Sequence, residues 1–237
     1  MNVYLRLLTV MVVLSFVSIG RADTITLSAT EDTTIYSNLV NNSGGGHNFG
    51  IAGQASNGND RRFLLRFDLT GIAPGSTVTS AQLDLDILQV GNSGGSFELF
   101  RIDTDWGEGT QTGNQGNAAG AGDATWNEAE FGSVDWTPGG SFFDPVLSNV
   151  QVSSTGISSF NSSANFTSAI QAIVDDPTQN FGFLISSPDT NSAVRIGSRE
   201  GASAPQLSVE FTAVPEPTTL PILLFGMAGL SFFRSKK

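Results

Sequence analysis

Residues 78–90 read Val-Thr-Ser-Ala-Gln-Leu-Asp-Leu-Asp-Ile-Leu-Gln-Val, and this stretch decides the fold class. From residue 81 to residue 87 apolar and polar side chains alternate without a break. Successive side chains of a β-strand point to opposite faces, so the alternation predicts a strand with one buried and one exposed face. The predicted buried face consists of Ala81, Leu83, Leu85 and Ile87.

Further short runs with a β-pattern occur on both sides of this strand, separated by turn residues. The glycine-rich residues 91–95 predict a hairpin directly after it. Short strands at this spacing, with helix nearly absent, predict an all-β sandwich. The predicted strands cover residues 24–27, 33–36, 63–67, 97–102, 181–185, 193–196 and 207–211.

Two segments depart from the strand pattern. Phe166, Ile170, Ile173 and Val174 share one helical face, which predicts a single helix that ends before Pro177. Asn165 is the predicted N-cap of this helix. Residues 107–145 are rich in glycine and poor in aliphatic side chains, so we expect long loops without a core layer, with residues 125–127 as a short strand.

The composition of the 237 residues excludes several classes of function. The chain has no cysteine and one histidine, which excludes disulfides, thiol nucleophiles and a three-histidine zinc site. It has 11 basic and 22 acidic side chains, so a nucleic-acid partner is not expected. Residues 23–217 keep six arginines, no lysine and all 22 acidic residues, a formal charge of −16. Such a surface suits divalent cations or neutral glycans better than anionic polymers.

The N-terminal segment predicts export. Residues 1–22 combine Arg6, an apolar stretch and the small residues Gly20 and Ala22 before Asp23. This is the layout of a secretory signal peptide that is cleaved between Ala22 and Asp23. The alternative is a retained membrane anchor, although the apolar run is short for a span of roughly 20 residues.

The C-terminal segment is also apolar. Residues 218–233 predict a short membrane-spanning helix of about 24 Å, followed by a basic end that stays on the cytoplasmic side. The alternative is a buried core helix. Pro215, Glu216 and Pro217 precede the apolar segment, and Arg234, Lys236 and Lys237 follow it. In this order and spacing, residues 214–237 resemble the PEP-CTERM sorting signal. The resemblance implies recognition by an exosortase-type membrane protease and a temporary membrane anchor.

Residues 23–213 form one predicted domain, and an ordered set of short motifs lies within it. The motifs include Glu31-Asp32-Thr33-Thr34-Ile35, Arg62-Phe63-Leu64-Leu65-Arg66-Phe67-Asp68-Leu69, Thr125-Trp126-Asn127 and Asn180-Phe181-Gly182-Phe183-Leu184. In this order they resemble the DNRLRE-domain family of jelly-roll modules. The resemblance implies a jelly-roll β-sandwich and, by analogy, polysaccharide binding.

The candidate glycan-binding residues are aromatic and basic. Trp106, Trp126 and Trp136 lie in or beside the polar loop region, where a flat ring can stack on a sugar. The alternative is that the three rings cap the sandwich core. Five arginines fall in two clusters, which form one basic spot if their strands are neighbours, and Arg62, Arg195 and Arg199 are the candidates there. Guanidinium groups bind uronates by bidentate contacts, whereas the alternative is internal ion pairs with acidic neighbours.

Acidic side chains suggest a structural Ca²⁺ ion. Asp103, Asp105 and Glu108 cluster within six residues, and Glu31 and Asp32 form a second pair near the first strand. Calcium takes roughly six to eight oxygen ligands, often from such loops. The five residues are therefore the candidate calcium ligands, although their spacing does not match a twelve-residue calcium loop.

Catalytic groups are scarce. His47 follows three glycines and predicts an exposed loop residue, and Tyr36 belongs to a predicted strand. Glu128 and Glu130 lie two residues apart in a loop, where carboxylates are usually solvated. We therefore expect an exported, non-enzymatic module that joins the cell surface or the extracellular polysaccharide matrix. A structural or adhesive protein without a sugar pocket is the second interpretation, and a small lyase or hydrolase is the third.

Overall fold

The computed structural model describes residues 21–91 and 94–214. The chain divides into two units, Ala22–Val214 and the two terminal segments, and the first unit is described here. Nearly all of the predicted signal peptide and sorting tail, including both predicted apolar helices, lie outside the described residues. No helix within the described ranges is long and apolar enough to cross a membrane.

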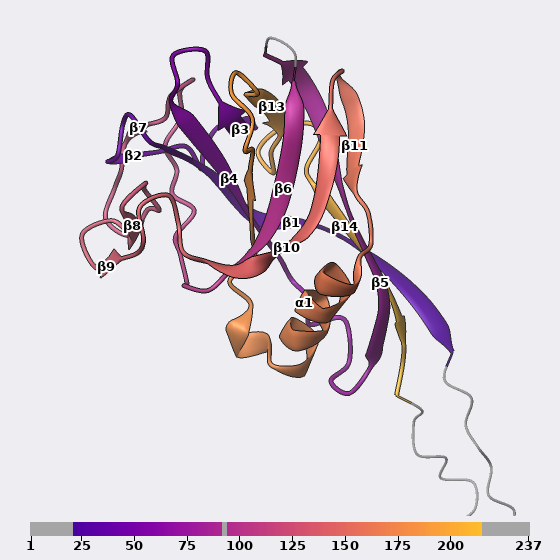
Figure 1. Cartoon of the computed structure of the whole chain (residues 1–237). Helices are drawn as coiled ribbons and strands as arrows, with labels where there is room; N and C mark the ends of the chain where they lie inside the picture. The colour runs from indigo at the N-terminus through magenta and orange to yellow at the C-terminus, as the bar shows by residue number, and fades with distance from the viewer. Residues whose placement is uncertain (1–20, 92–93, 215–237) are drawn as a thin grey trace, which may run out of the picture. The chain divides into compact units, whose positions relative to one another are not determined.

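Ten antiparallel strands form one hydrogen-bonded sheet that folds into two layers, with β11 branching from β5 (Figure 1). One layer contains β5, β11, β13 and β14, and the other contains β4, β6, β10 and β12. β1 and β3 pair with strands of both layers and so join them at two places. The strands are β1 (Ala22–Tyr36), β3 (Phe49–Gln54), β4 (Asp60–Phe67), β5 (Thr77–Val90), β6 (Gly95–Ile102), β10 (Phe142–Val152), β11 (Gly156–Phe160), β12 (Phe183–Ser186), β13 (Val194–Gly197) and β14 (Gln206–Thr212).

The main hydrophobic core lies between the layers. The predicted inward face of β5 is confirmed, since its four residues are at most 2 % exposed. They pack in one cluster with apolar side chains of β4, β6, β12 and β14. The all-β class expected from the alternation is therefore confirmed.

One α-helix, α1 (Ala164–Asp175), closes the end of the sandwich where β1 begins and β14 ends (Figure 1). Its apolar face contributes Phe166, Ile170, Ile173 and Val174 to the main core, as predicted. The predicted N-cap was wrong by two residues. Ser163 caps the helix because its hydroxyl accepts a hydrogen bond from the Phe166 N–H at 3.0 Å. The short 3-10 helix η1 (Pro177–Gln179) follows.

A second hydrophobic cluster covers the outer face of the β4–β6–β12 layer. Leu64 and Leu184 belong to it, whereas their neighbours on the same strands belong to the main core. Opposite faces of a strand carry alternate residues, so these strands are apolar on both sides. The loop region supplies the other half of this cluster, namely Trp106, Ala124, Ala129 and Trp136.

The expectation that residues 107–145 form no core layer was therefore wrong. They are mostly loop, but widely spaced tryptophan and alanine side chains anchor them to the sheet. Three short strands occur here, β7 (Asn117–Ala118), β8 (Glu128–Glu130) and β9 (Val134–Asp135), and β7 pairs with β2 (Asn42–Ser43). The predicted strand at residues 125–127 was also wrong, because Thr125 has no regular structure and Trp126 and Asn127 form a bend before β8.

Candidate functional site

A groove with a volume of about 340 Å³ opens on the outer face of the sandwich, where β3, β13 and β5 lie side by side. Ile51, Arg195 and Gln89 are direct partners across these three strands and form its base. The β3–β4 turn and residues 114–115 supply the walls. The lining includes two arginines and four amide side chains, and it includes no carboxylate. These polar residues are Arg61, Arg195, Asn57, Gln89, Asn114 and Gln115.

A β-bulge in β5 brings Gln89 into the groove. Arg195 pairs with Gln89, but Ile196 pairs with Ile87, so Leu88 has no partner on β13. A bulge residue interrupts the inward–outward alternation of a strand. Before the bulge the odd-numbered residues of β5 face the core. After it the even-numbered Val90 packs against the core and Gln89 faces solvent.

Arg195 is held in position by two contacts. Its guanidinium carbon lies 4.3 Å from the centroid of the Phe49 ring, and its Nη2 donates a hydrogen bond to Asn114 Oδ1 at 3.3 Å. Stacking on an aromatic ring stabilises a guanidinium and leaves its edge free for other acceptors. No carboxylate of the described residues forms an ion pair with Arg195. The side chain therefore keeps its charge available to a ligand.

Arg61 is the second cation of the groove, and it is more deeply buried, at 5 % exposed. Its Nη1 donates to the backbone carbonyl of Asp60 at 3.0 Å, and its guanidinium lies 5.2 Å from the Tyr36 ring. Burial lowers the pKa of Arg61 from its ordinary value, while the nearby Tyr36 and Asp60 raise it. Burial likewise raises the pKa of Tyr36 to about 12, so its phenol stays neutral beside the arginine.

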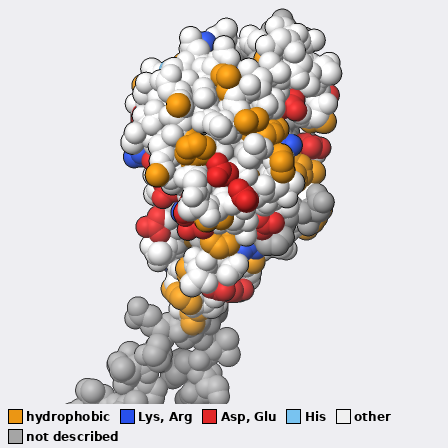
Figure 2. All heavy atoms as spheres, turned by 90° about the vertical axis from the view of Figure 1, so that its left-hand side faces the viewer, with side chains coloured by type: hydrophobic (Ala, Val, Ile, Leu, Met, Phe, Trp, Pro, Cys, Tyr) orange, Lys and Arg blue, Asp and Glu red, His pale blue; other side chains and the backbone are white. Residues whose placement is uncertain are grey.

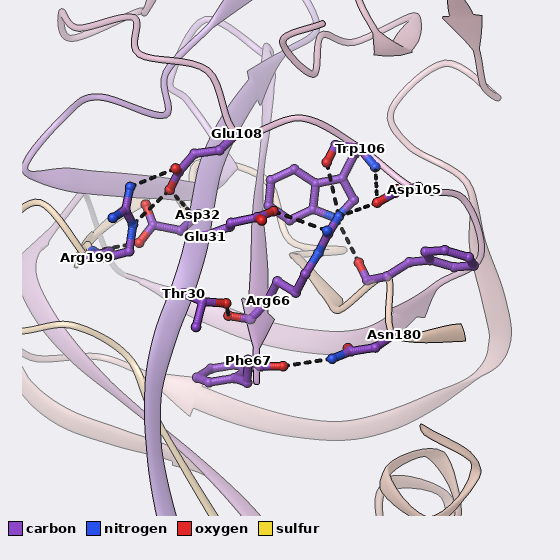
Figure 3. A network of polar contacts seen from close by, with 11 residues as sticks. Thr30, Glu31, Asp32, Arg66, Phe67, Asp105, Trp106, Glu108, Asn180 and Arg199 are labelled. Carbon is purple, nitrogen blue, oxygen red and sulfur yellow. Dashed lines mark hydrogen bonds and ion pairs between the residues drawn. The ribbon is translucent and has the colours of Figure 1, made fainter. Parts of the chain in front are cut away.

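A separate acidic cluster joins β1 to two loops (Figure 3). Carboxylate oxygens of Asp32, Glu108 and Glu200 all lie within 4.8 Å of one another. Arg199 is the cation among them: its Nη2 lies 2.7 Å from Glu108 Oε2 and 2.6 Å from Glu200 Oε1. The backbone N–H of Arg199 donates to Asp32 Oδ2 at 2.6 Å, and that of Asp32 donates to Glu108 Oε1 at 2.8 Å.

Burial dominates the electrostatics of Asp32, which is 1 % exposed. It raises the pKa of Asp32 to about 7, and the neighbouring Glu200 and Glu108 charges act in the same direction. The hydrogen bond from the Arg199 N–H and the Arg199 charge lower that pKa only in part. Burial also raises the pKa of Glu200. Ionisation of Asp32 near neutral pH therefore adds a negative charge to this cluster.

Two of the five predicted calcium ligands, Asp32 and Glu108, lie in this cluster. Glu200 joins them from the β13–β14 loop, which the sequence pattern did not indicate. The other three lie elsewhere: Glu31 and Asp105 form ion pairs with Arg66, and Asp103 accepts a hydrogen bond from Thr104. Three carboxylates supply part of the roughly six to eight oxygens that calcium takes. Calcium binding here stays a prediction.

The three tryptophans differ in exposure. Trp106 is 3 % exposed and Trp136 is 7 % exposed, and both belong to the second hydrophobic cluster. Their indole N–H groups donate to backbone carbonyls, Trp106 to Phe181 at 2.7 Å and Trp136 to Thr125 at 3.1 Å. These contacts match the alternative role of core anchors. Trp126 is half-buried, with the Arg62 guanidinium 5.3 Å from its ring.

Two of the predicted arginines serve internal contacts. Arg62 donates from Nη1 to the Gly139 carbonyl at 2.6 Å and also lies 5.5 Å from the Phe142 ring. Arg199 forms ion pairs within the acidic cluster, which was the alternative prediction for this residue. The strands of the two arginine clusters are not neighbours, because β3 lies between β4 and β13. One arginine of each cluster nevertheless lines the groove. Arg195 and Arg61 form the resulting basic spot.

His47 is not the exposed loop residue that the glycine-rich context predicted. It is half-buried and lies against Phe49 with the ring centroids 3.8 Å apart and the ring planes tilted by 51°. Its Nδ1 is buried without a hydrogen-bond partner. Phe49 also contacts Arg195, so His47 packs behind the residue that holds the base of the groove.

The sequence pattern missed the amide residues of the groove. Asn57 precedes Gly58 in one turn, and Asn114 and Gln115 precede Gly116 in another. Each segment on its own indicates a turn. The turns of Asn57 and Asn114 lie 57 residues apart in the sequence. Only the tertiary fold brings both of them beside Arg195.

Comparisons with known proteins bear on both parts of the chain. Residues 23–137 match carbohydrate-binding module family 96. This stretch includes the lining residues Asn57, Arg61, Gln89, Asn114 and Gln115 and ends before Arg195. The match agrees with the expected carbohydrate-binding type of module, while the DNRLRE family stays a resemblance.

Residues 213–237 match the PEP-CTERM protein-sorting motif, which confirms the predicted sorting signal. The motif indicates an exported protein with a C-terminal sorting signal that anchors it in a membrane. No curated protein matches the chain.

Proposed function

We propose that the chain is an exported, non-catalytic module of the jelly-roll type that binds polysaccharide in the groove of Arg61 and Arg195. The match to a carbohydrate-binding module family supports binding, and the sorting motif supports export. One observation carries the choice of site. Residues 23–217 have a formal charge of −16, yet this groove contains two arginines without ion-pair partners among the described residues, and no carboxylate.

The groove has the hydrogen-bonding groups that sugars require. Asn and Gln side chains each offer a donor and an acceptor, which match the paired hydroxyl groups of a pyranose ring. Three such side chains, Gln89, Asn114 and Gln115, lie beside Arg195. A guanidinium binds a carboxylate or sulfate through two parallel N–H groups. The groove therefore suits an acidic sugar residue, with the amide groups on the hydroxyls next to it.

Aromatic stacking is not the main contact in this proposal. Within the described residues no tryptophan, tyrosine or phenylalanine lines the groove, and Phe49 is already in contact with Arg195 and His47. Trp126 is the remaining candidate for stacking, because it alone among the tryptophans keeps substantial exposure. It belongs to the second hydrophobic cluster rather than to the groove, so it would serve a separate contact.

The ends of the chain serve sorting in this proposal. A signal peptidase removes residues 1–22, and an exosortase-type protease cuts near Pro215, Glu216 and Pro217 after the apolar segment 218–233 has held the protein in the inner membrane. The mature protein then stays at the cell surface or enters the extracellular matrix. Figure 2 shows acidic side chains spread over the loop-bearing face of the body, with few basic ones. Such a surface keeps the protein soluble among anionic polymers except at its basic groove.

A second candidate function is a structural or adhesive matrix protein without a sugar pocket. The observation in its favour is that Arg62, Arg66 and Arg199 are all engaged in internal contacts. A polysaccharide panel separates the two. Residues 22–214, which contain both hydrophobic clusters, would be titrated with polygalacturonate, hyaluronan, dextran sulfate and dextran by isothermal titration calorimetry.

We expect binding to at least one acidic polymer and a loss of about tenfold or more in affinity for Arg195→Gln, since an Arg side chain there makes charge-assisted hydrogen bonds. Arg101→Gln changes the net charge equally at a site outside the groove and should leave the affinity within about twofold. No binding to any polymer, or equal losses for the two variants, would favour the structural role.

A further inference from the structure

β5 runs from one end of the folded body (residues 22–214) to the other, so its length gives the distance between these two ends. At its first residue, Thr77 pairs with Thr212 of β14. At its last residue, Val90 pairs with Val194 of β13. A strand rises by roughly 3.3 Å per residue, so these two pairings lie about 40 Å apart.

The chain enters and leaves the body at the Thr77 end of β5. Ala22, the first residue of β1, pairs with Thr212, so the two ends of the body lie side by side. Val214 follows two residues later and lies next to Gly75 in the turn before β5. Figure 1 shows the start of β1 and the end of β14 together at this end of the sandwich.

The groove lies at the Val90 end. Its base, Gln89 and Arg195, is one pairing away from Val90 and Val194, and its wall is the β3–β4 turn. Figure 1 shows β3 and β13 at the end of the sandwich away from the start of β1. The body thus has two ends with different features, the groove at one and both chain exits at the other.

We infer that the body binds polysaccharide with the groove turned away from its point of attachment, so that it can bind while it is still held through its C-terminus. The inference rests on the proposed function. A groove beside Val214 would be covered by whatever surface holds the chain there, whereas a groove about 40 Å away stays open. The anchored protein then links its attachment surface to acidic polysaccharide beyond it.

The absence of cysteine allows a direct test, because one introduced cysteine gives one attachment point. Val214→Cys places it at the chain exit, and Thr190→Cys places it at an exposed position of the β12–β13 loop, at the groove end of the fold but outside the groove lining. Each variant of residues 22–214 is biotinylated, captured on streptavidin beads and incubated with fluorescent polygalacturonate, hyaluronan, dextran sulfate and dextran. The same biotinylated variants are titrated in solution before capture.

We expect both variants to bind equally in solution. After capture, Val214→Cys should keep its binding capacity, and Thr190→Cys should lose about tenfold or more, because capture there turns the groove toward the bead. Equal loss for both variants, or loss for Val214→Cys alone, would overturn the inference while leaving the proposed function intact. Absence of binding by both variants and by the unmodified body in solution would overturn the proposed function and this inference together.

Discussion

Arg195 lies directly opposite Gln89 in the β13–β5 ladder, on the solvent side of the sheet. The pair exists because Leu88 is a bulge residue, which shifts the side-chain alternation of β5 by one position at this point. A guanidinium and an amide side by side present donors for an acidic group and for a hydroxyl within the width of one sugar ring. This relationship forms the centre of the proposed binding site.

Gln89→Ala should weaken polysaccharide binding without destabilising the fold. Gln89 is exposed and has no hydrogen-bond partner among the described side chains, so its loss removes only contacts to ligand. We expect a three- to tenfold loss in affinity, about 1 kcal/mol for one hydrogen bond. Gln151→Ala, at an exposed position of β10, is the matched control and should leave the affinity unchanged. Calorimetry and thermal melts distinguish the two, and an unchanged affinity for Gln89→Ala would remove this residue from the site.

Trp106→Ala should act on stability rather than on binding. The ring is buried against the outer face of the sheet, its N–H is paired with the Phe181 carbonyl, and Arg66 lies 5.0 Å from it. Truncation of a buried tryptophan costs about 3–5 kcal/mol of unfolding free energy, which urea denaturation measures. Trp106→Phe keeps most of the volume and should retain full affinity. Loss of binding by the well-folded Trp106→Phe variant would return Trp106 to the binding site.

The contribution of Asp32 to the stability of the fold should fall as pH rises from about 4 to about 7. Burial raises the pKa of Asp32 from 3.8 to about 7, so the folded chain holds a proton in this range that the unfolded chain has already lost. The contribution of this group to the free energy of unfolding therefore decreases through this window and levels off above pH 7. Asp32→Asn cannot ionise but keeps an acceptor for the Arg199 N–H. The melting temperature of Asp32→Asn minus that of the native chain should increase between pH 4.5 and pH 8.

The control for this comparison is Asp135→Asn at an exposed position, for which the difference in melting temperature should stay flat. A flat difference for Asp32→Asn as well would contradict the account of the buried carboxylate.

The same variants test calcium at pH 8. An increase in melting temperature with CaCl₂ that is lost in Asp32→Asn would support a calcium site at Asp32, Glu108 and Glu200, and equal melting temperatures would reject it.

Replacement of Pro215, Glu216 and Pro217 by alanine should prevent release from the inner membrane. These residues lie in the matched sorting motif and precede the apolar segment. Two prolines keep the backbone extended, which is the form in which a protease binds its substrate. Fractionation of cells that contain an exosortase should find the triple variant in the membrane fraction and the native protein outside it. Pro188→Ala, in the folded body, is the control, and normal release of the triple variant would reject the sorting role.

The sequence predicted those elements whose pattern is local. β5, β6, β14 and α1 have regular periodicity and were predicted within one or two residues. β3, β10 and β11 were missed because each carries residues that strands seldom contain: Gly50 and Gly53 in β3, Pro145 in β10 and Gly156 in β11. The sheet tolerates them because β3 bends between the two layers and β10 and β11 lie at sheet edges.

The sites depended on pairings that the sequence does not state. Asp32 and Glu108 were predicted ligands in two separate groups, and only the fold brings them to Glu200. Trp106 and Trp136 were candidate stacking platforms, with capping of the core as the alternative, and they pack as core anchors because the sheet below them is apolar on both faces. Arg195 was predicted as a binding residue from its charge alone, whereas the amides around it come from two distant turns and a bulge.

The central claim is that polysaccharide binds in the groove of Arg61 and Arg195. It is tested most directly by backbone amide chemical shifts of ¹⁵N-labelled residues 22–214 during titration with oligogalacturonate. The account predicts that the largest shifts fall on residues 51–57, 89–91, 114–115 and 193–195, and that they vanish in Arg195→Gln. Shifts concentrated around Trp126 or on the outer face of β1 and β14, with the groove residues unchanged, would contradict it.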